Sequence, residues 1–452
     1  MDNPKMLGEK SINRLLWDFS LPAITGMLVN ALYNVVDSIF VGHGVGAIGL
    51  AAVTIAFPIM IVFMGFGMLV GVGATTLISI RIGQQKKQEA EKILGNALVL
   101  GMILSISLST LFLIFLDPLL VRLGAEPMVL PYAHDFTHII LLGSIFMFTG
   151  FGLNNIIRAE GSPKVAMMTM IISAVLNTIL NPLFIFGLGM GIRGSALATV
   201  LSQAVSAIWV LSHFLGSNSF LKFRPGNFVL DRVIVTNIFT MGASAFFMQI
   251  AASVVVGLSN FTLAFYGGQM AVAAMGVINR LSMLMLMPLF GIGQGMAPIV
   301  GYNYGAKNYG RVREAAQTAI IAATVISVCG FIAIEVFDTY IIRLFSSDTE
   351  LITLGAAGLR VFLCMLPIIG FQIIGSMFFQ AIGKPAQSLL LSMSRQLLFL
   401  IPMLLVLPRY LGLEGVWLSG PISDLGATLV TALLFFIEIR RLTPCEANPR
   451  CD

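Results

Sequence analysis

Charged side chains are scarce in this sequence. Only 10% of its 452 residues are Asp, Glu, Lys or Arg, whereas a soluble domain carries about 25%. The mean hydropathy is +0.94. Because so few charges cannot cover the water-facing surface of a chain this long, the composition excludes an ordinary soluble protein and indicates a protein that lies in a membrane.

Residues that build catalytic and metal sites are also scarce. The chain has four Cys and four His, and the patterns DDxxD, HExxH, GxSxG and GxxxxGK[ST] do not occur in it. His134 and His138 are four residues apart, as metal ligands can be, but no third ligand is evident. We therefore expect that the protein is not an enzyme and holds no metal or organic cofactor.

Apolar runs are abundant instead. About 20 consecutive apolar residues span a bilayer as a helix, and no segment shows the alternation of a barrel strand. The sequence therefore predicts an all-α polytopic membrane protein. We expect twelve spans, at 15–41, 47–79, 90–116, 129–157, 165–187, 193–215, 233–264, 270–300, 312–337, 354–380, 386–408 and 415–439.

The positive charges are distributed unevenly between the predicted loops. Nineteen of the 26 Lys and Arg residues lie at the N-terminus, in the C-terminal tail or in loops that follow even-numbered spans. The positive-inside rule then places both termini in the cytoplasm, with the chain in the inner (plasma) membrane. Topology thus explains the net charge of +5, and we expect no nucleic-acid partner.

The two halves of the chain resemble each other. "AEGSPK" (159–164) and "AIGKPA" (381–386) share Ala, Gly and Pro at a spacing of 222, and "GIRG" (191–194) meets "GLEG" (412–415) at a spacing of 221. Three glycine pairs also have the spacing of 222: Gly71 with Gly293, Gly73 with Gly295, and Gly83 with Gly305. The pattern predicts a parallel repeat of six helices, an arrangement found in secondary transporters.

This repeat predicts two pseudo-symmetric six-helix lobes. We expect an N-terminal lobe at 1–214 and a C-terminal lobe with a short cytoplasmic tail at 233–452. The stretch 215–232 contains Gly, Ser, Asn, Pro and four charges, which is typical of a linker, and we expect it on the cytoplasmic side.

The acid Asp37 lies inside the first predicted span, about one turn of helix before its outer end at residue 41. Tyr33, Asn34 and Asp37 follow Asn30 at i+3, i+4 and i+7, so all four lie on one helix face. An ionised Asp in a membrane helix costs about 2.5–3.5 kcal/mol, and no Lys or Arg of the N-terminal half lies at a comparable depth. Asp37 is therefore a candidate for taking up a proton or Na⁺, unless it only contacts solvent at the outer end of the span.

Two later spans of the same half provide polar partners. Ser173, Asn177 and Asn181 are each four residues apart, and a second series consists of Ser195, Thr199, Ser202 and Ser206. Most such residues form hydrogen bonds between helices. From these two series we expect Asn177, Asn181 and Thr199 to lie near Asp37.

The C-terminal half carries three charges near the bilayer midplane. Arg280, Arg395 and Asp424 each lie about ten residues from a helix end, or about 15 Å of rise. Charges at this depth pair with one another and face the interior. We expect a charge cluster in which Asp424 is shared between the two arginines, with direct contact to substrate as the alternative.

Three stretches resemble a known family: "LYNVVDSIFVG" (32–42), "LNTILNPLFIFGLGMGIRGSALAT" (176–199) and "PIVGYNYGAKNYGRVREA" (298–315). On these motifs the chain resembles the multidrug and toxic compound extrusion (MATE) transporters, in the bacterial and archaeal branch with its coupling site in the N-terminal lobe. The resemblance covers nearly the whole chain. It implies two lobes around a central cavity, alternating access, and export of amphipathic, often cationic small molecules in exchange for H⁺ or Na⁺.

The resemblance also implies roles for individual residues. Asp37 matches the coupling-ion acid of the family, Asn177 and Thr199 match its hydrogen-bonding partners, and Pro22 matches a proline linked to bending of the first helix. Asn181 stands where members of this branch commonly carry a second Asp. Because an amide cannot take up a proton near neutral pH, we expect Asp37 to titrate alone. The neutral neighbour makes Na⁺ or direct cation binding more plausible than is usual in the family, but we favour H⁺ as the coupling ion. We also expect a monomer as the working unit.

Two other transporter classes share twelve helices in two halves. A lipid-linked oligosaccharide flippase of the same superfamily is the alternative function, but such proteins line their cavity with several cationic residues, and here only Arg280 and Arg395 qualify. A major facilitator carries a characteristic charged loop between its second and third helices. The corresponding loop here, "RIGQQKKQEAEK" (81–92), lacks that pattern.

Overall fold

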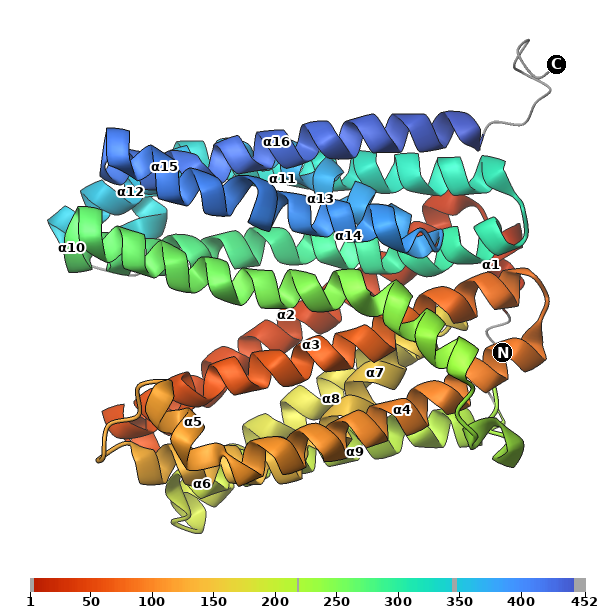
Figure 1. Cartoon of the computed structure of the whole chain (residues 1–452), viewed down its shortest axis with the longest axis horizontal. Coiled ribbons are helices and arrows are strands. Elements are labelled where there is room, and N and C mark those ends of the chain that lie inside the picture. The colour runs from red at the N-terminus through yellow and green to blue at the C-terminus, as the bar shows by residue number, and fades with distance from the viewer. Residues whose placement is uncertain (1–3, 218, 344–347, 443–452) are drawn as a thin grey trace. The chain divides into compact units, whose positions relative to one another are not determined.

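The computed structural model describes residues 4–217, 219–343 and 348–442, and these residues contain helices and no strand. Figure 1 shows long helices that lie side by side. Up to residue 228 the elements are α1 (Met6–Glu9), α2 (Ile12–Gly44), α3 (Ala47–Gly83), α4 (Lys87–Ile114), α5 (Leu116–Arg122), α6 (Leu130–Leu142), α7 (Ser144–Ala159), α8 (Pro163–Pro182), η1 (Leu183–Gly187), α9 (Gly191–Leu215) and η2 (Pro225–Phe228). The later elements are α10 (Arg232–Gly305), α11 (Tyr309–Arg343), α12 (Thr349–Leu363), α13 (Leu366–Ala381), α14 (Pro385–Met393), η3 (Ser394–Leu400), α15 (Ile401–Leu411) and α16 (Leu413–Arg441).

The described residues contain twelve helical spans. Nine helices are long and apolar enough to cross a membrane, and two bent pairs, α6–α7 (53°) and α12–α13 (48°), each add one span. Helix α10 has 74 residues, or about 110 Å at 1.5 Å per residue, which far exceeds a hydrocarbon core of about 30 Å. It is broken at Gly268, where φ is 67° and ψ is −169°, and so supplies two spans. The predicted number and placement of the spans are confirmed.

The backbone itself repeats at the spacing read from the sequence. A positive φ is rare outside glycine, so its recurrence at matched positions is informative. Three matched pairs have the spacing of 222: Gly46 (82°) with Gly268 (67°), Gln85 (61°) with Lys307 (58°), and Gly161 (101°) with Gly383 (72°). Gly191 (55°) and Gly412 (58°) have the spacing of 221. The predicted duplication is confirmed, including the loss of one position late in the second half relative to the first.

Packing divides the chain into two compact units whose ends differ from the expected lobes. Unit 1 consists of Thr25–Phe246 and the first residues through Glu9, and unit 2 of Lys10–Ile24 and the chain from Phe247 onward. The first part of α2 therefore packs in unit 2, and the first part of α10 packs in unit 1. The chain also changes unit after Glu9, and the two crossing points that lie inside helices, after Ile24 and after Phe246, have the same spacing of 222 as the matched glycines. That the two functional lobes comprise residues 1–214 and 233–452 stays a prediction.

Glycines explain why these helix ends pack as they do. In unit 1, a Cβ added to Gly73 of α3 would lie 2.1 Å from the carbonyl oxygen of Ile238. In unit 2, a Cβ added to Gly295 would lie 2.7 Å from the backbone nitrogen of Ser20. Only glycine allows helices to approach this closely. Gly73 therefore lets the first part of α10 pack on α3 in unit 1, and Gly295 lets the first part of α2 pack on α10 in unit 2.

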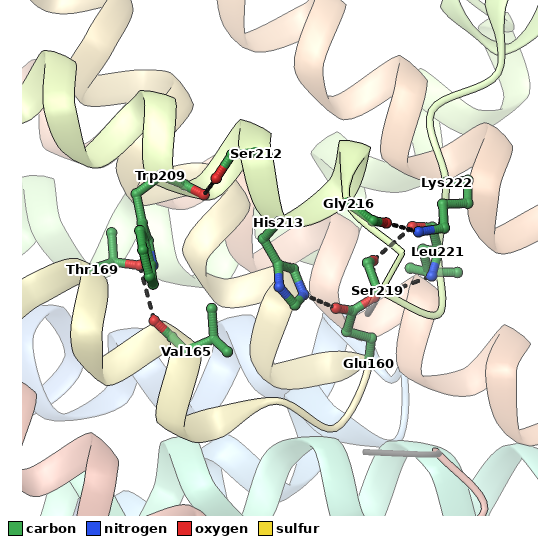
Figure 2. Close-up of polar contacts among 10 residues, drawn as sticks. All are labelled: Glu160, Val165, Thr169, Trp209, Ser212, His213, Gly216, Ser219, Leu221 and Lys222. Atoms are coloured by element: carbon green, nitrogen blue, oxygen red, sulfur yellow. Dashed lines mark hydrogen bonds and ion pairs between the residues drawn. The ribbon is translucent and has the colours of Figure 1, made fainter. Parts of the chain in front are cut away.

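The predicted linker, 215–232, is described except at 218, and its described part is anchored to unit 1. Glu160 is fully buried between α7 and α8 and accepts hydrogen bonds from Ser219 Oγ (2.8 Å) and Leu221 N (3.1 Å). The Nε2 atom of His213, at the end of α9, also contacts its carboxylate. Figure 2 shows His213 and the linker converging on this carboxylate from two sides.

A second anchor holds the later part of the linker on α4. The fully buried carboxylate of Glu91 pairs with the guanidinium of Arg224. Asn96, which is 1% exposed, accepts a hydrogen bond from Asp231 N (2.8 Å) and donates to the carbonyl oxygens of Asn227 (3.3 Å) and Val229 (3.2 Å). The linker has the composition of a loose loop, but these contacts fix it to unit 1.

Candidate functional site

Asp37 lies on the part of α2 that belongs to unit 1, among neutral hydrogen-bond donors. Asn181 of α8 donates from Nδ2 to Oδ1 of Asp37, and Ser195 Oγ of α9 donates to the same oxygen over 3.4 Å. Asn181 and Ser195 are both 0% exposed, whereas Asp37 is partly buried. No Lys, Arg or His that the structure describes forms an ion pair with Asp37.

The turn between α8 and α9 brings these donors together. Pro182 lacks a backbone N–H, and the chain continues from it as a π-helix, η1. Gly189 and Gly191 then adopt positive φ, at 63° and 55°, and the chain reverses into α9. As a result Asn181 and Ser195, on two different helices, both reach one carboxylate. π-Helical turns are frequent at functional sites.

Asn177 and Thr199 form a second polar contact, one helical turn from the first. Asn177 Nδ2 donates to Thr199 Oγ1 over 3.1 Å, and the two residues are 2% and 7% exposed. The structure therefore pairs the residues predicted from the two helices, but neither of them forms a hydrogen bond with Asp37. They stabilise the α8–α9 pair that presents Asn181 and Ser195.

The remaining predicted residues of this site are more distant from the carboxylate contacts. Asn34 is exposed and bonds Asn30 of its own helix, at 2.8 Å to the backbone oxygen and 3.1 Å to the side-chain oxygen. Tyr33 is partly buried one turn before Asp37 and interacts with it electrostatically. Pro22 is buried within α2, about 22 Å along the helix from Asp37 and two residues before α2 passes from unit 2 to unit 1.

Ser195 is the residue that sequence reasoning missed. It was expected only to hold helices together, although its oxygen contacts Asp37 directly. The available signal was its position four residues before Thr199, on the same face of α9. The sequence could not rank the two hydroxyls because their depth in α9 depends on the length of the turn after Asn181.

The charge cluster predicted for the C-terminal half is only partly formed. Nε of Arg395, in the π-helix η3, donates to Oδ1 of Asp424 in α16, and Asp424 is 3% exposed. The prediction that two arginines share Asp424 is wrong, because Arg280 has an exposed side chain and contacts no acid that the structure describes. Arg280 lies on the face of α10 that points away from the core of unit 2, whereas Asp424 lies inside that core.

A metal centre is not evident at any described position. No group of three or more His, Cys, Asp or Glu side chains in the described residues could hold a metal ion. His134, which the spacing had singled out, bonds Asp117 over 2.6 Å and stacks on His138 with the ring centroids 5.7 Å apart.

Comparison with known proteins finds a family model and named relatives that match this chain over most of its length. A family model named MatE matches residues 22–183 and 232–406. Multidrug export protein MepA of Staphylococcus haemolyticus (strain JCSC1435) is 28% identical over 440 residues, covering 97% of each chain. Multidrug export protein MepA of Staphylococcus aureus (strain MSSA476) is 27% identical over 436 residues, covering 96% of each.

Solved structures share the fold from end to end. A multidrug resistance MATE family transporter of the MOP superfamily, in an outward-facing conformation, has a TM-score of 0.92 and 28% identity, with 98% of this chain and 99% of the other covered. A MOP superfamily transporter from Pyrococcus furiosus Vc1 (DSM3638) has a TM-score of 0.92 and 27% identity, with the same coverage. Because the family model matches most of both halves and the duplicated fold is shared along the whole chain, this protein belongs to the MATE family of membrane transporters and is not an enzyme.

Proposed function

We propose that this transporter exports amphipathic, often cationic small molecules by cation-coupled antiport, with Asp37 as the coupling-ion site. Several relatives are named multidrug export proteins, which supports export of structurally varied compounds. Alternating access would expose Asp37 to each side of the membrane in turn. Whether the Asp37 carboxylate holds a coupling ion would then decide which of the two alternating-access states, open to one side of the membrane or to the other, is the more stable.

The observation that carries this proposal is the neutral surrounding of Asp37. Its carboxylate receives hydrogen bonds from an amide and a hydroxyl, and no described cation pairs with it. An acid that is occupied by an arginine, as Asp424 is by Arg395, is not free to exchange a small cation. An acid that lies in a membrane helix with neutral donors alone can instead exchange a small cation.

Among small cations we favour H⁺ over Na⁺. Both groups that contact Asp37 are donors, an amide nitrogen and a hydroxyl, whereas Na⁺ needs several oxygen ligands, as hard cations do. The oxygen Oδ1 of Asn181 is buried and has no partner among the described residues. Rotation of the amide would turn this oxygen toward Asp37, so Na⁺ remains the alternative to be tested.

Transport in proteoliposomes tests the proposal. Purified protein is reconstituted, an H⁺ or a Na⁺ gradient is imposed, and movement of ethidium is followed by fluorescence. We expect the H⁺ gradient to drive movement and Asp37→Asn to abolish it, because the amide cannot take up a proton. Asp117→Asn, which neutralises an exposed acid of α5, is the control and should retain transport. If neither gradient moves the dye in the unmodified protein, antiport is ruled out.

The flippase alternative is weakened by the pairing of Arg395. A lipid-linked pyrophosphate needs several free cationic groups in one chamber. Of the two arginines that could serve, Arg395 is occupied by Asp424, which leaves Arg280. One guanidinium suits a single anionic group better than a pyrophosphate.

We propose further that both termini are cytoplasmic, that the chain lies in the inner (plasma) membrane, and that it works as a monomer without a nucleic-acid partner. The distribution of Lys and Arg between alternate loops supports the orientation.

A further inference from the structure

Arg280 lies deep within a membrane-spanning helix. It follows the break of α10 at Gly268 and precedes the end of that helix at Gly305. These separations correspond to about 18 Å and about 38 Å of helix, and the hydrocarbon core is about 30 Å thick. The guanidinium is therefore attached well inside the span and cannot be assigned to either membrane surface.

The side chain points away from the core of unit 2. Ile278, two residues earlier, is fully buried and lies with Trp417 against Gly358 of α12. Two residues correspond to about 200° around a helix, so Arg280 occupies the opposite face, where it is exposed. A charge at this depth does not face lipid but a water-filled cavity.

The guanidinium of Arg280 has no partner in the part of the chain that the structure describes. It forms no hydrogen bond or ion pair with any residue that the structure describes, in contrast to Arg395, which holds Asp424. A structural arginine in a membrane is normally paired. An unpaired one at this depth, in a transporter, is available to bind what is transported.

There is also space beside it. Gly276 lies one turn earlier on the same exposed face, and a Cβ added there would meet no atom within 4 Å. Ala273, one turn before Gly276, and Met283, one turn after Arg280, are exposed as well. Small residues and a flexible thioether form a surface against which a flat apolar ring can pack.

We propose that Arg280 binds a carboxylate carried by the transported compounds, so that the preferred substrates are amphipathic acids and zwitterions. The planar guanidinium matches a carboxylate with two parallel hydrogen bonds. It repels a compound whose only charge is positive. The inference rests on the proposed export function and ranks its substrates: compounds that also carry an acid bind more tightly, whereas purely cationic compounds such as ethidium are still moved but bind more weakly.

A dye and its methyl ester form a matched pair for the test. Rhodamine 110 has a free aryl carboxylate, and rhodamine 123 is its methyl ester with the same cationic ring system. Binding of each to the purified full chain in nanodiscs, without an ion gradient, is measured by fluorescence anisotropy. For Arg280→Gln we expect the affinity for the acid to fall about ten-fold to a hundred-fold, and the affinity for the ester to stay the same or rise.

Two further variants make the result specific. Arg280→Lys keeps the charge without the planar fork and should bind the acid with intermediate affinity; it also serves if the Gln variant does not fold. Arg409→Gln removes an exposed charge at the outer end of α15 and should change neither affinity. The proposal is overturned if the unmodified protein fails to bind the acid, or if Arg280→Gln leaves both affinities unchanged or lowers them equally. Failure of the export function would appear separately, as dyes that bind but are not moved by either gradient.

Discussion

Asp37 and Asp424 both lie within membrane-spanning helices of this protein, and their surroundings suit them to different tasks. Asp424 is 3% exposed and pairs with Arg395. Asp37 is partly exposed, and among the described residues its carboxylate receives hydrogen bonds from Asn181 and Ser195. A buried ion pair is costly to break, so Asp424 is suited to hold α16 and η3 together. A carboxylate with neutral donors can gain and lose a small cation without breaking an ion pair.

Asn181 and Asn177 should differ in their effect on coupling. Asn181→Ala removes a donor from the Asp37 carboxylate, whereas Asn177→Ala removes only the contact with Thr199. A hydrogen bond to a charged group contributes about 1.5–3 kcal/mol, so we expect Asn181→Ala to lower H⁺-driven dye efflux about ten-fold or more. Asn177→Ala should lower it less than Asn181→Ala does. Equal loss in both, measured at matched protein amounts, would mean that Asn181 acts only through helix packing.

Separating Asp424 from Arg395 should destabilise the protein. Asp424→Asn leaves the Arg395 guanidinium uncompensated inside unit 2, and loss of one partner of a buried pair typically costs about 3–5 kcal/mol. We expect a clear drop in the midpoint of thermal unfolding in detergent. The double variant Arg395→Met, Asp424→Leu should regain most of the loss. A single variant as stable as the unmodified protein contradicts a structural role for the pair.

At the scale of elements, the connection between the halves is a fixed part of unit 1. Glu160 and Glu91 are fully buried acids that hold the linker, the first through Ser219 and Leu221 and the second through Arg224. Motion between units is therefore not taken up within the anchored residues of the linker. The chain passes from one unit to the other at Glu9–Lys10, between α1 and α2, and at two positions inside helices, Ile24–Thr25 in α2 and Phe246–Phe247 in α10.

Loss of Asn96 should release the linker without unfolding the unit. Asn96→Ala removes three hydrogen bonds to the backbone of residues 227–231 and leaves buried groups unpaired, at a cost of about 1–3 kcal/mol. We expect faster hydrogen–deuterium exchange in 225–231, with little change in the core of α3. Gln88→Ala, at an exposed position of the same helix, is the control. Unchanged exchange in 225–231 would show that other contacts suffice to hold the linker.

At the scale of the whole molecule, the twelve spans and the distribution of basic residues determine which loops share a side of the membrane. The loop at 84–86 follows the second span and carries Lys86, with Arg81 and Lys87 beside it. The connection at 115–129, which includes α5 and joins the third span to the fourth, contains one basic residue, Arg122. The positive-inside rule places the first loop in the cytoplasm and the second outside.

Cysteine labelling tests this orientation in intact cells. In a background with all four native cysteines replaced by Ser, Lys86→Cys should resist a membrane-impermeant maleimide until the cells are opened. Glu126→Cys should react at once. Both positions are exposed, so accessibility of the side chain is matched between them. Reaction of Lys86→Cys in sealed cells would reverse the proposed topology.

The sequence determined the class, the twelve spans and the duplication, because these depend on local properties. A run of about 20 apolar residues must form a spanning helix in lipid. A residue at positive φ requires glycine or a tolerant polar side chain wherever it occurs, so Gly46 and Gly268 mark the same helix start in both halves. Helical periodicity also placed Asn177 on one face with Asn181, and Thr199 on one face with Ser195.

Only the tertiary structure decided which side chains meet. The reach of Ser195 to Asp37 depends on the π-turn and two glycines after Asn181, and the separation of Arg280 from Asp424 depends on the rotation of α10 about its axis. A difference of one residue in a turn changes the direction of a side chain by about 100°. Sequence spacing fixes faces within one helix, whereas contacts between helices depend on rotations and depths that are set by packing.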